Sequence, residues 1–128
     1  MKLRINGNSI RLRLSRSEVA NFDATGRIED VVDFGTIGKF TYSMTMVEDF
    51  TVTSGYNSSG LQVKVPRSLA QDWTKTDRVE ISAEQPVGAG KTLQILIEKD
   101  FQCIHKRSDD DHDAYPNPLA AVSDHASD

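Results

Sequence analysis

Two arginines near the start of the chain have the spacing that contacts with a phosphate backbone require. In the segment SIRLRL, residues 9–14, Arg11 and Arg13 alternate with apolar side chains. Side chains two positions apart in a β-strand lie on the same face, about 6.5–7 Å from each other, which is close to the distance between successive phosphates of one nucleic-acid strand. The segment therefore predicts a strand with one buried face and one basic face that is able to follow a DNA backbone.

Other polar and basic side chains close to this segment extend the same surface. The residues that we expect to contact double-stranded DNA are Lys2, Arg4, Asn8, Arg11, Arg13 and Arg16. Two interpretations without DNA also account for the arginines. Either the strand presents a solvated face with nothing bound, or the arginines form ion pairs with acids such as Glu29 and Asp30 on the next strand.

Charge is distributed unevenly along the chain of 128 residues. The sequence is 38% hydrophobic and 27% charged with a formal net charge of −4, which is typical of one globular domain. Basic residues dominate positions 1–27, whereas positions 108–128 contain aspartates but neither lysine nor arginine. No apolar run approaches the roughly 18 residues that cross a bilayer, so we expect a cytoplasmic protein without a membrane partner.

The residue types that catalysis or metal binding needs are present without the required spacing. Cys103 is the only cysteine, and together with His105 and His112 it does not match the spacing of a closed zinc site. The segment VGAGKT at 87–92 precedes a strand pattern, whereas a phosphate-binding loop needs a helix there. No Ser-His-Asp or Cys-His arrangement can be proposed. We therefore expect no catalytic residues, no metal, no cofactor and no enzymatic activity.

The sequence contains an internal repeat with an offset of 51 residues and no gap. Identical pairs include Arg16 with Arg67, Ser17 with Ser68, Thr25 with Thr76, Arg27 with Arg78, and Asp49-Phe50 with Asp100-Phe101. Apolar positions also agree, for example Leu12 with Val63 and Phe22 with Trp73. One copy alone cannot bury its hydrophobic strand faces, so we expect the two copies to interleave.

Each copy follows the order β-β-α-β-β. The expected strands are 2–5, 9–14, 27–34 and 39–47 in the first copy, and 51–56, 60–65, 78–84 and 91–98 in the second. The expected helices are 16–23 and 67–73. The first begins with a capping box, because Ser15 is followed three residues later by Glu18. The second begins after Pro66, a residue favoured where a helix starts.

These elements predict an α+β fold, mostly β, built as a barrel of two tandem repeats. We expect one barrel domain over residues 1–105, with the repeats at about 1–51 and 52–102. The remaining residues, 106–128, are polar, contain proline and lack periodicity, which predicts an acidic disordered tail.

Two stretches of the repeat resemble the motifs of a known family. GNSIRLRLS resembles the G-N-S-x-x-V-R-I-P signature of the AbrB/MazE swapped-hairpin family, and GLQVKVPRSLAQDW resembles the same strand and helix. The resemblance places Arg13 at the arginine of the signature and puts Gly7, Asn8 and Ser9 in its turn. It implies a swapped-hairpin pseudo-dimer within one chain, and a bacterial DNA-binding transcription regulator or antitoxin.

The second copy departs from this signature. Gln62 and Lys64 stand where the first copy has Arg11 and Arg13, so we expect one strong and one weak basic face. Such asymmetry argues against binding to a palindromic operator. The opening of the chain and the segments EKDFQC and DAYPNP are also similar to a family of small uncharacterised bacterial proteins.

The tail offers an alternative function. It contains an apolar island: Tyr115, Pro116, Pro118 and Leu119. Either this island docks on the barrel or it contacts a protein partner, and the acidic tail could also fold back on the basic strand and compete with DNA. With a protein partner on the island, the protein would be an interaction module that acts through this tail. A further alternative is a small ligand-binding or catalytic barrel with its site among the loops at 23–26 and 74–78. For the oligomeric state we expect a monomeric pseudo-dimer or a weak homodimer.

Overall fold

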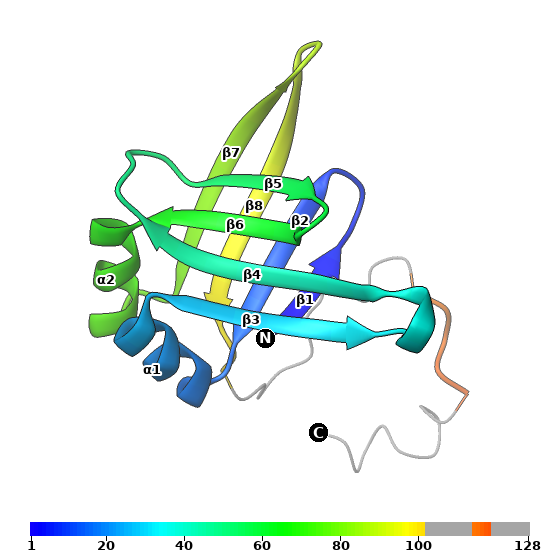
Figure 1. Ribbon diagram of the computed structural model, residues 1–128, viewed down its shortest axis with the longest axis horizontal. Coiled ribbons are helices and arrows are strands. Elements are labelled where there is room, and N and C mark those ends of the chain that lie inside the picture. The colour runs from blue at the N-terminus through cyan, green and yellow to red at the C-terminus, as the bar shows by residue number, and fades with distance from the viewer. Residues whose placement is uncertain (102–113, 119–128) are drawn as a thin grey trace.

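The computed structural model describes residues 1–101 and 114–118, and the first of these ranges forms two four-stranded sheets and two helices (Figure 1). Sheet A has the order β1 (Lys2–Ile5), β2 (Ser9–Leu14), β8 (Lys91–Lys99) and β7 (Glu80–Gly88). Sheet B has the order β3 (Arg27–Asp33), β4 (Lys39–Val47), β6 (Gly60–Pro66) and β5 (Thr53–Asn57). The predicted class, α+β and mostly β, is confirmed.

Each sheet combines one hairpin from each half of the chain. In sheet A, β2 of the first half runs parallel to β8 of the second, with Ile10 opposite Ile95. In sheet B, β4 runs parallel to β6, with Met44 opposite Val63. Within the described residues no strand pairing joins the two sheets. The sheets are thus interleaved but are not closed into the barrel that we expected.

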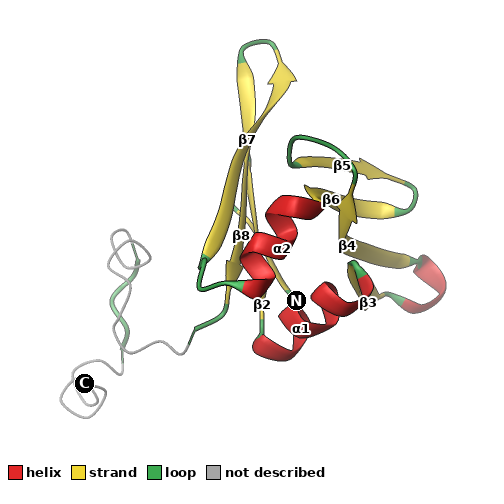
Figure 2. Cartoon of the chain, turned by 90° about the vertical axis from the view of Figure 1, so that its left-hand side faces the viewer, coloured by secondary structure: helices red, strands yellow, loops and turns green. Residues whose placement is uncertain are grey.

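The two helices lie at one end of the molecule, beside the space between the sheets (Figure 2). In α1 (Arg16–Thr25) the backbone N–H of Glu18 donates to the Ser15 hydroxyl, and the Glu18 carboxylate accepts from the Ser15 N–H at 2.8 Å. The predicted capping box is therefore confirmed. α2 (Arg67–Lys75) begins directly after Pro66, as predicted. Both helices run two residues beyond their expected ends.

The core lies between the inner faces of the sheets and the helices. Its largest fully buried side chains come from both halves of the chain: Leu12, Leu14, Phe22, Met44, Val63, Val65, Trp73, Ile81, Ile95 and Ile97. The rings of Phe22 and Trp73, equivalent positions of the repeat, meet edge to face with centroids 6.4 Å apart. Neither half could bury these side chains alone, which explains why the halves interleave.

The repeat breaks in the last hairpin of the second half. Met44 pairs with Ile28, but Ile95, the equivalent of Met44, pairs with Ala83 instead of Val79. The cause is the turn between β7 and β8. Ala89 and Gly90 form a two-residue loop with positive φ angles of 53° and 71°, so β7 extends through the expected turn to Gly88.

The same shift lengthens the connection between α2 and β7. Four residues, Thr76–Val79, link these elements, whereas Gly26 alone links α1 to β3. The longer connection lies at the helical end of the molecule and forms part of a groove described below.

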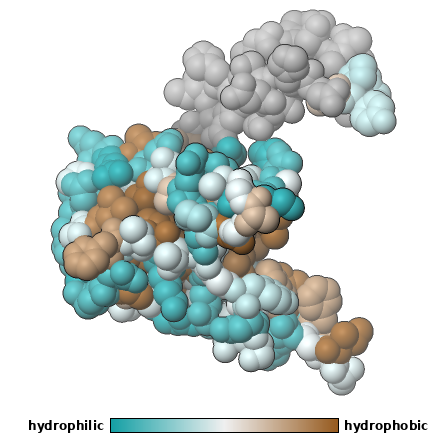
Figure 3. Space-filling view, turned by 90° about the horizontal axis from the view of Figure 1, so that it is seen from above, coloured by the Kyte–Doolittle hydropathy of each residue, from teal (hydrophilic) through white to brown (hydrophobic). Residues whose placement is uncertain are grey.

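The hairpin β3–β4 extends beyond its partner strands and exposes apolar side chains. Phe34 directly precedes the short 3₁₀ turn Gly35–Ile37 and is 57% exposed. Ile37, the last residue of this turn, is 89% exposed. Figure 3 shows apolar atoms in brown at the projecting lower right of the molecule, where this hairpin extends. Among the described residues, no helix has the length and apolar character needed to cross a membrane.

Candidate functional site

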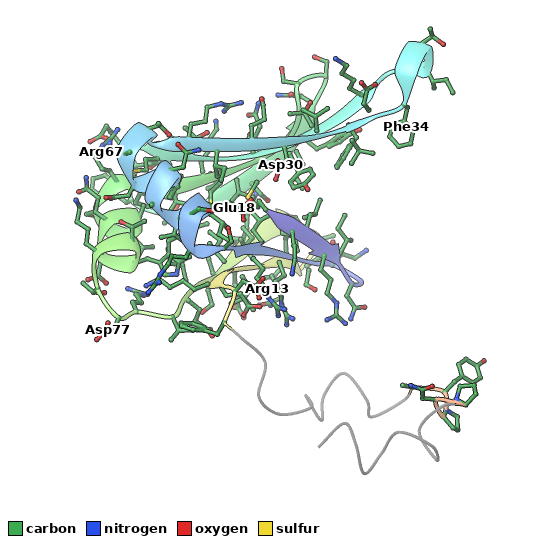
Figure 4. The ribbon with its side chains drawn as sticks, turned by 90° about the horizontal axis from the view of Figure 1, so that it is seen from below. Arg13, Glu18, Asp30, Phe34, Arg67 and Asp77 are labelled. Atoms are coloured by element: carbon green, nitrogen blue, oxygen red, sulfur yellow. The ribbon has the colours of Figure 1, made fainter. Side chains whose placement is uncertain are left out.

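Four basic side chains lie in two directly opposed pairs on the hairpin β1–β2. Lys2 is opposite Arg13, and Arg4 is opposite Arg11. Both arginines of β2 alternate with buried apolar residues, so their side chains lie on the outer face of sheet A. Figure 4 shows Arg13 on the side of this hairpin that faces away from β3 and β4. The predicted basic strand face is therefore present.

Two carboxylates meet this basic face. Arg13 donates from Nε and Nη2 to one oxygen of Glu98, at 2.8 and 2.6 Å, and Nε of Arg11 lies 3.8 Å from the same oxygen. Lys2 Nζ lies 3.1 Å from Asp100. Among the described residues, Glu98 and Asp100 thus form ion pairs with Arg13, Arg11 and Lys2 on this face. The ion-pair interpretation thus holds for part of the face.

The acids that we expected as partners lie elsewhere, because the neighbour of β2 is β8 and not β3. Asp30 and Glu18 accept from the α-amino group of Met1, which lies 2.6 Å from Oδ2 of Asp30. Glu29 pairs with Arg27 at 3.4 Å. Figure 4 shows Glu18 and Asp30 on the side of β1 that faces β3.

Burial and the neighbouring charged groups shift the pKa values of the Met1 amine and of Glu18 in opposite directions. Burial alone would lower the pKa of the Met1 amine, but its hydrogen bonds to Asp30 and Glu18 outweigh burial and raise that pKa above its usual value. Burial alone would raise the pKa of Glu18, but the amine and the N–H and hydroxyl of Ser15 lower it. This cluster stabilises the start of α1 and the start of β1 against each other.

Asn8 and Arg16 do not join the four cations. The side-chain amide of Asn8 donates to the backbone carbonyl of Thr92 at 2.8 Å. The backbone carbonyl of Asn8 accepts from the backbone N–H of Gln94 at 3.1 Å. Asn8 therefore anchors the β1–β2 turn to the hairpin β7–β8. Arg16 begins α1 and is exposed on a groove at the helical end.

The groove lies between α1, the α2–β7 connection and the end of β8, with a volume of about 1100 Å³. Its lining includes Leu14 and Arg16 from the first half, and Asp77, Lys99 and Phe101 from the second. It takes in the two loops named above as an alternative site. There, Asp23 accepts from the Thr74 hydroxyl at 2.8 Å and lies 3.5 Å from Lys75 Nζ.

A smaller groove of about 410 Å³ lies at the equivalent position of the repeat. Arg67, Glu48 and Phe50 line it, and these are the equivalents of Arg16, Lys99 and Phe101 in the larger groove. Sequence reasoning did not identify Lys99 or Phe101 as site residues. The repeated Asp-Phe pair at the end of each half was the signal that could have found them.

The family DUF7009, a family of unknown function, matches residues 1–119. The chain belongs to DUF7009. The basic face and both grooves lie within the region that DUF7009 covers. No curated protein and no solved structure gives a significant match to the chain.

The tail residues of this DUF7009 chain are described only in part. Tyr115, Pro116 and Pro118 are exposed, whereas Leu119 and most of 106–128 lie outside the described residues. Cys103, His105 and His112 also lie outside them. Within the described ranges there is no group of three His, Cys, Asp or Glu side chains that could hold a metal ion.

Proposed function

We propose that the outer face of the hairpin β1–β2 binds double-stranded DNA. The two opposed cation pairs, Lys2 with Arg13 and Arg4 with Arg11, carry this proposal. Like charges directly opposite each other on one sheet face destabilise it, and a phosphate backbone relieves their repulsion. The hairpin thus concentrates positive charge where a polyanion gains most.

The interleaved topology supports the same proposal. Hairpins exchanged between two similar halves are what a swapped-hairpin pseudo-dimer would contain, and the residues of β2 resemble the signature of the AbrB/MazE family. The corresponding function is a DNA-binding transcription regulator or an antitoxin-like protein. The equivalent strand β6 carries Gln62 and Lys64, so the proposal assigns DNA to sheet A alone.

The expected affinity is modest, because two carboxylates neutralise part of the surface and the whole chain has a net charge of −4. Because Glu98 holds Arg13, about three phosphate contacts are expected, which give a slope near −2.7 for log K against log salt concentration. The affinity should then fall about 40-fold between about 50 and 200 mM salt.

Fluorescence anisotropy with a labelled duplex tests this proposal. Wild type is compared with Arg4→Ala/Arg11→Ala, and with the control Arg27→Ala/Arg78→Ala, which removes the same charge from two exposed arginines outside the site. We expect salt-dependent binding by wild type and the control, and its loss in the first variant. Equal binding by all three proteins, or none at low salt, would overturn the proposal.

A further inference from the structure

The larger groove and the smaller groove are the same site, formed twice by the repeat. In each, the start of a helix from one half meets the Asp-Phe pair that follows the last strand of the other half. The equivalent lining positions are Arg16 and Arg67, Ala20 and Gln71, Lys99 and Glu48, Asp100 and Asp49, and Phe101 and Phe50. The two grooves can therefore be compared position by position.

In the smaller groove the arginine forms an ion pair with a carboxylate of the same groove. Nε of Arg67 donates to the Glu48 carboxylate at 2.6 Å, and Gln71 occupies the next turn of the helix. In the larger groove, Lys99 stands at the position equivalent to Glu48, and Ala20 stands at the position equivalent to Gln71. The arginine there, Arg16, consequently has no carboxylate partner in the described part of the chain.

The remaining charges of the larger groove leave a positive surplus. Asp23 is paired with Lys75, and Asp100 is paired with Lys2. Lys99 donates to the Thr76 carbonyl at 2.8 Å and lies 5.8 Å from the centre of the Trp73 ring, without a carboxylate partner among the described residues. Among the groove residues that the structure describes, two cations without a carboxylate partner, Arg16 and Lys99, thus stand against one carboxylate without an ion pair, Asp77.

We propose that the larger groove binds a small organic carboxylate with an apolar body. The carboxylate pairs with Arg16 as that of Glu48 pairs with Arg67 in the smaller groove. The apolar body lies against Leu14, Val19 and Phe101, where Ala20 leaves space. A volume of about 1100 Å³ accommodates such a molecule. This inference goes beyond DNA binding and does not depend on it.

Two simple carboxylates, octanoate and 4-phenylbutyrate, serve as probes, each compared with its uncharged amide. The emission of Trp73, the only tryptophan, reports binding, because Lys99 lies over its ring and its indole N–H donates to the carbonyl of Val79. Backbone amide shifts of α1 and of residues 76–79 and 99–101 locate the site. We expect at least one acid to bind and its amide to bind at least tenfold more weakly.

Three variants test the assignment of the residues. Arg16→Gln should weaken binding at least tenfold, whereas Arg67→Gln, the same change in the smaller groove, should leave it unchanged. Ala20→Gln introduces the glutamine of the smaller groove at the equivalent position of the larger groove and should also weaken binding at least tenfold. Thermal unfolding checks that each variant is folded. Absence of binding by both acids at about 10 mM, or equal binding by the Arg16→Gln variant, would overturn the inference.

Discussion

The guanidinium of Arg13 donates two hydrogen bonds to Glu98 across the parallel strands β2 and β8, at 2.8 and 2.6 Å. Both side chains are largely covered, with 20% and 15% of their surface exposed. Glu98 is therefore the internal competitor for any phosphate that approaches this face.

Replacing Glu98 should strengthen DNA binding. In Glu98→Gln, both Arg13 and Arg11 lose a nearby negative charge, so we expect about one additional phosphate contact and a salt slope steeper by about 0.9. Anisotropy titrations at several salt concentrations measure this slope. Glu84→Gln, on β7 in the same sheet, is the matched control and should change neither slope nor affinity to that extent. A slope that is unchanged in Glu98→Gln would contradict the placement of DNA on this face.

The start of β6 depends on a glycine. Gly60 has a φ angle of +103°, and a Cβ atom there would lie 2.1 Å from the Thr41 carbonyl oxygen. Gly60→Ala should lower the free energy of unfolding by about 2–5 kcal/mol, through backbone strain and this clash. Gly55→Ala, where no atom lies within 4 Å of the added Cβ, is the control. Equal urea midpoints for the two variants would contradict the pairing of β4 with β6.

Acid should weaken the fold through Glu18. Its pKa is lower in the folded state, because hydrogen bonds from Met1 and Ser15 outweigh the effect of burial, so the carboxylate stabilises the fold at any pH above the ordinary pKa of a glutamate. This stabilisation is lost as the pH falls through the lower, folded-state pKa. Glu18→Gln keeps the capping geometry without the charge. The difference in unfolding free energy between wild type and this variant should therefore shrink from pH 6 to pH 3, and a constant difference would refute the argument.

The contact between Phe22 and Trp73 should hold the two halves together. Phe22 is fully buried, and Phe22→Ala should cost about 3–5 kcal/mol of unfolding free energy. Phe50→Ala removes the same group at a position that is 98% exposed and should cost less than about 0.5 kcal/mol. Denaturant unfolding followed by Trp73 emission measures both. A loss below about 1 kcal/mol in Phe22→Ala would show that this contact is not a central part of the core.

Local patterns in the sequence were sufficient for the elements and for the basic face. The alternation around Arg11 and Arg13 predicts one buried face, and the spacing of Ser15 and Glu18 predicts the start of α1; both are confirmed. The repeat predicts that the halves interleave, since neither can bury its own apolar strand faces.

Contacts between distant segments could not be predicted in the same way. The partner of Arg13 is Glu98, which lies 85 positions later, because β2 pairs in parallel with β8. Nothing in the residues around Arg13 identifies that neighbour. The larger groove depends on the shifted register of β7, which follows from a two-residue turn that the repeat alignment does not show.

Binding of DNA to the outer face of β1 and β2 can be tested by mapping where DNA contacts the protein. Amide chemical shifts of the labelled wild-type protein are followed while a short DNA duplex is added at about 50 mM salt. We expect the shift changes to concentrate on β1 and β2, around Lys2, Arg4, Arg11 and Arg13, and to disappear as salt is raised. Shifts confined to sheet B or to the helices, or no shifts at all, would contradict DNA binding by this face.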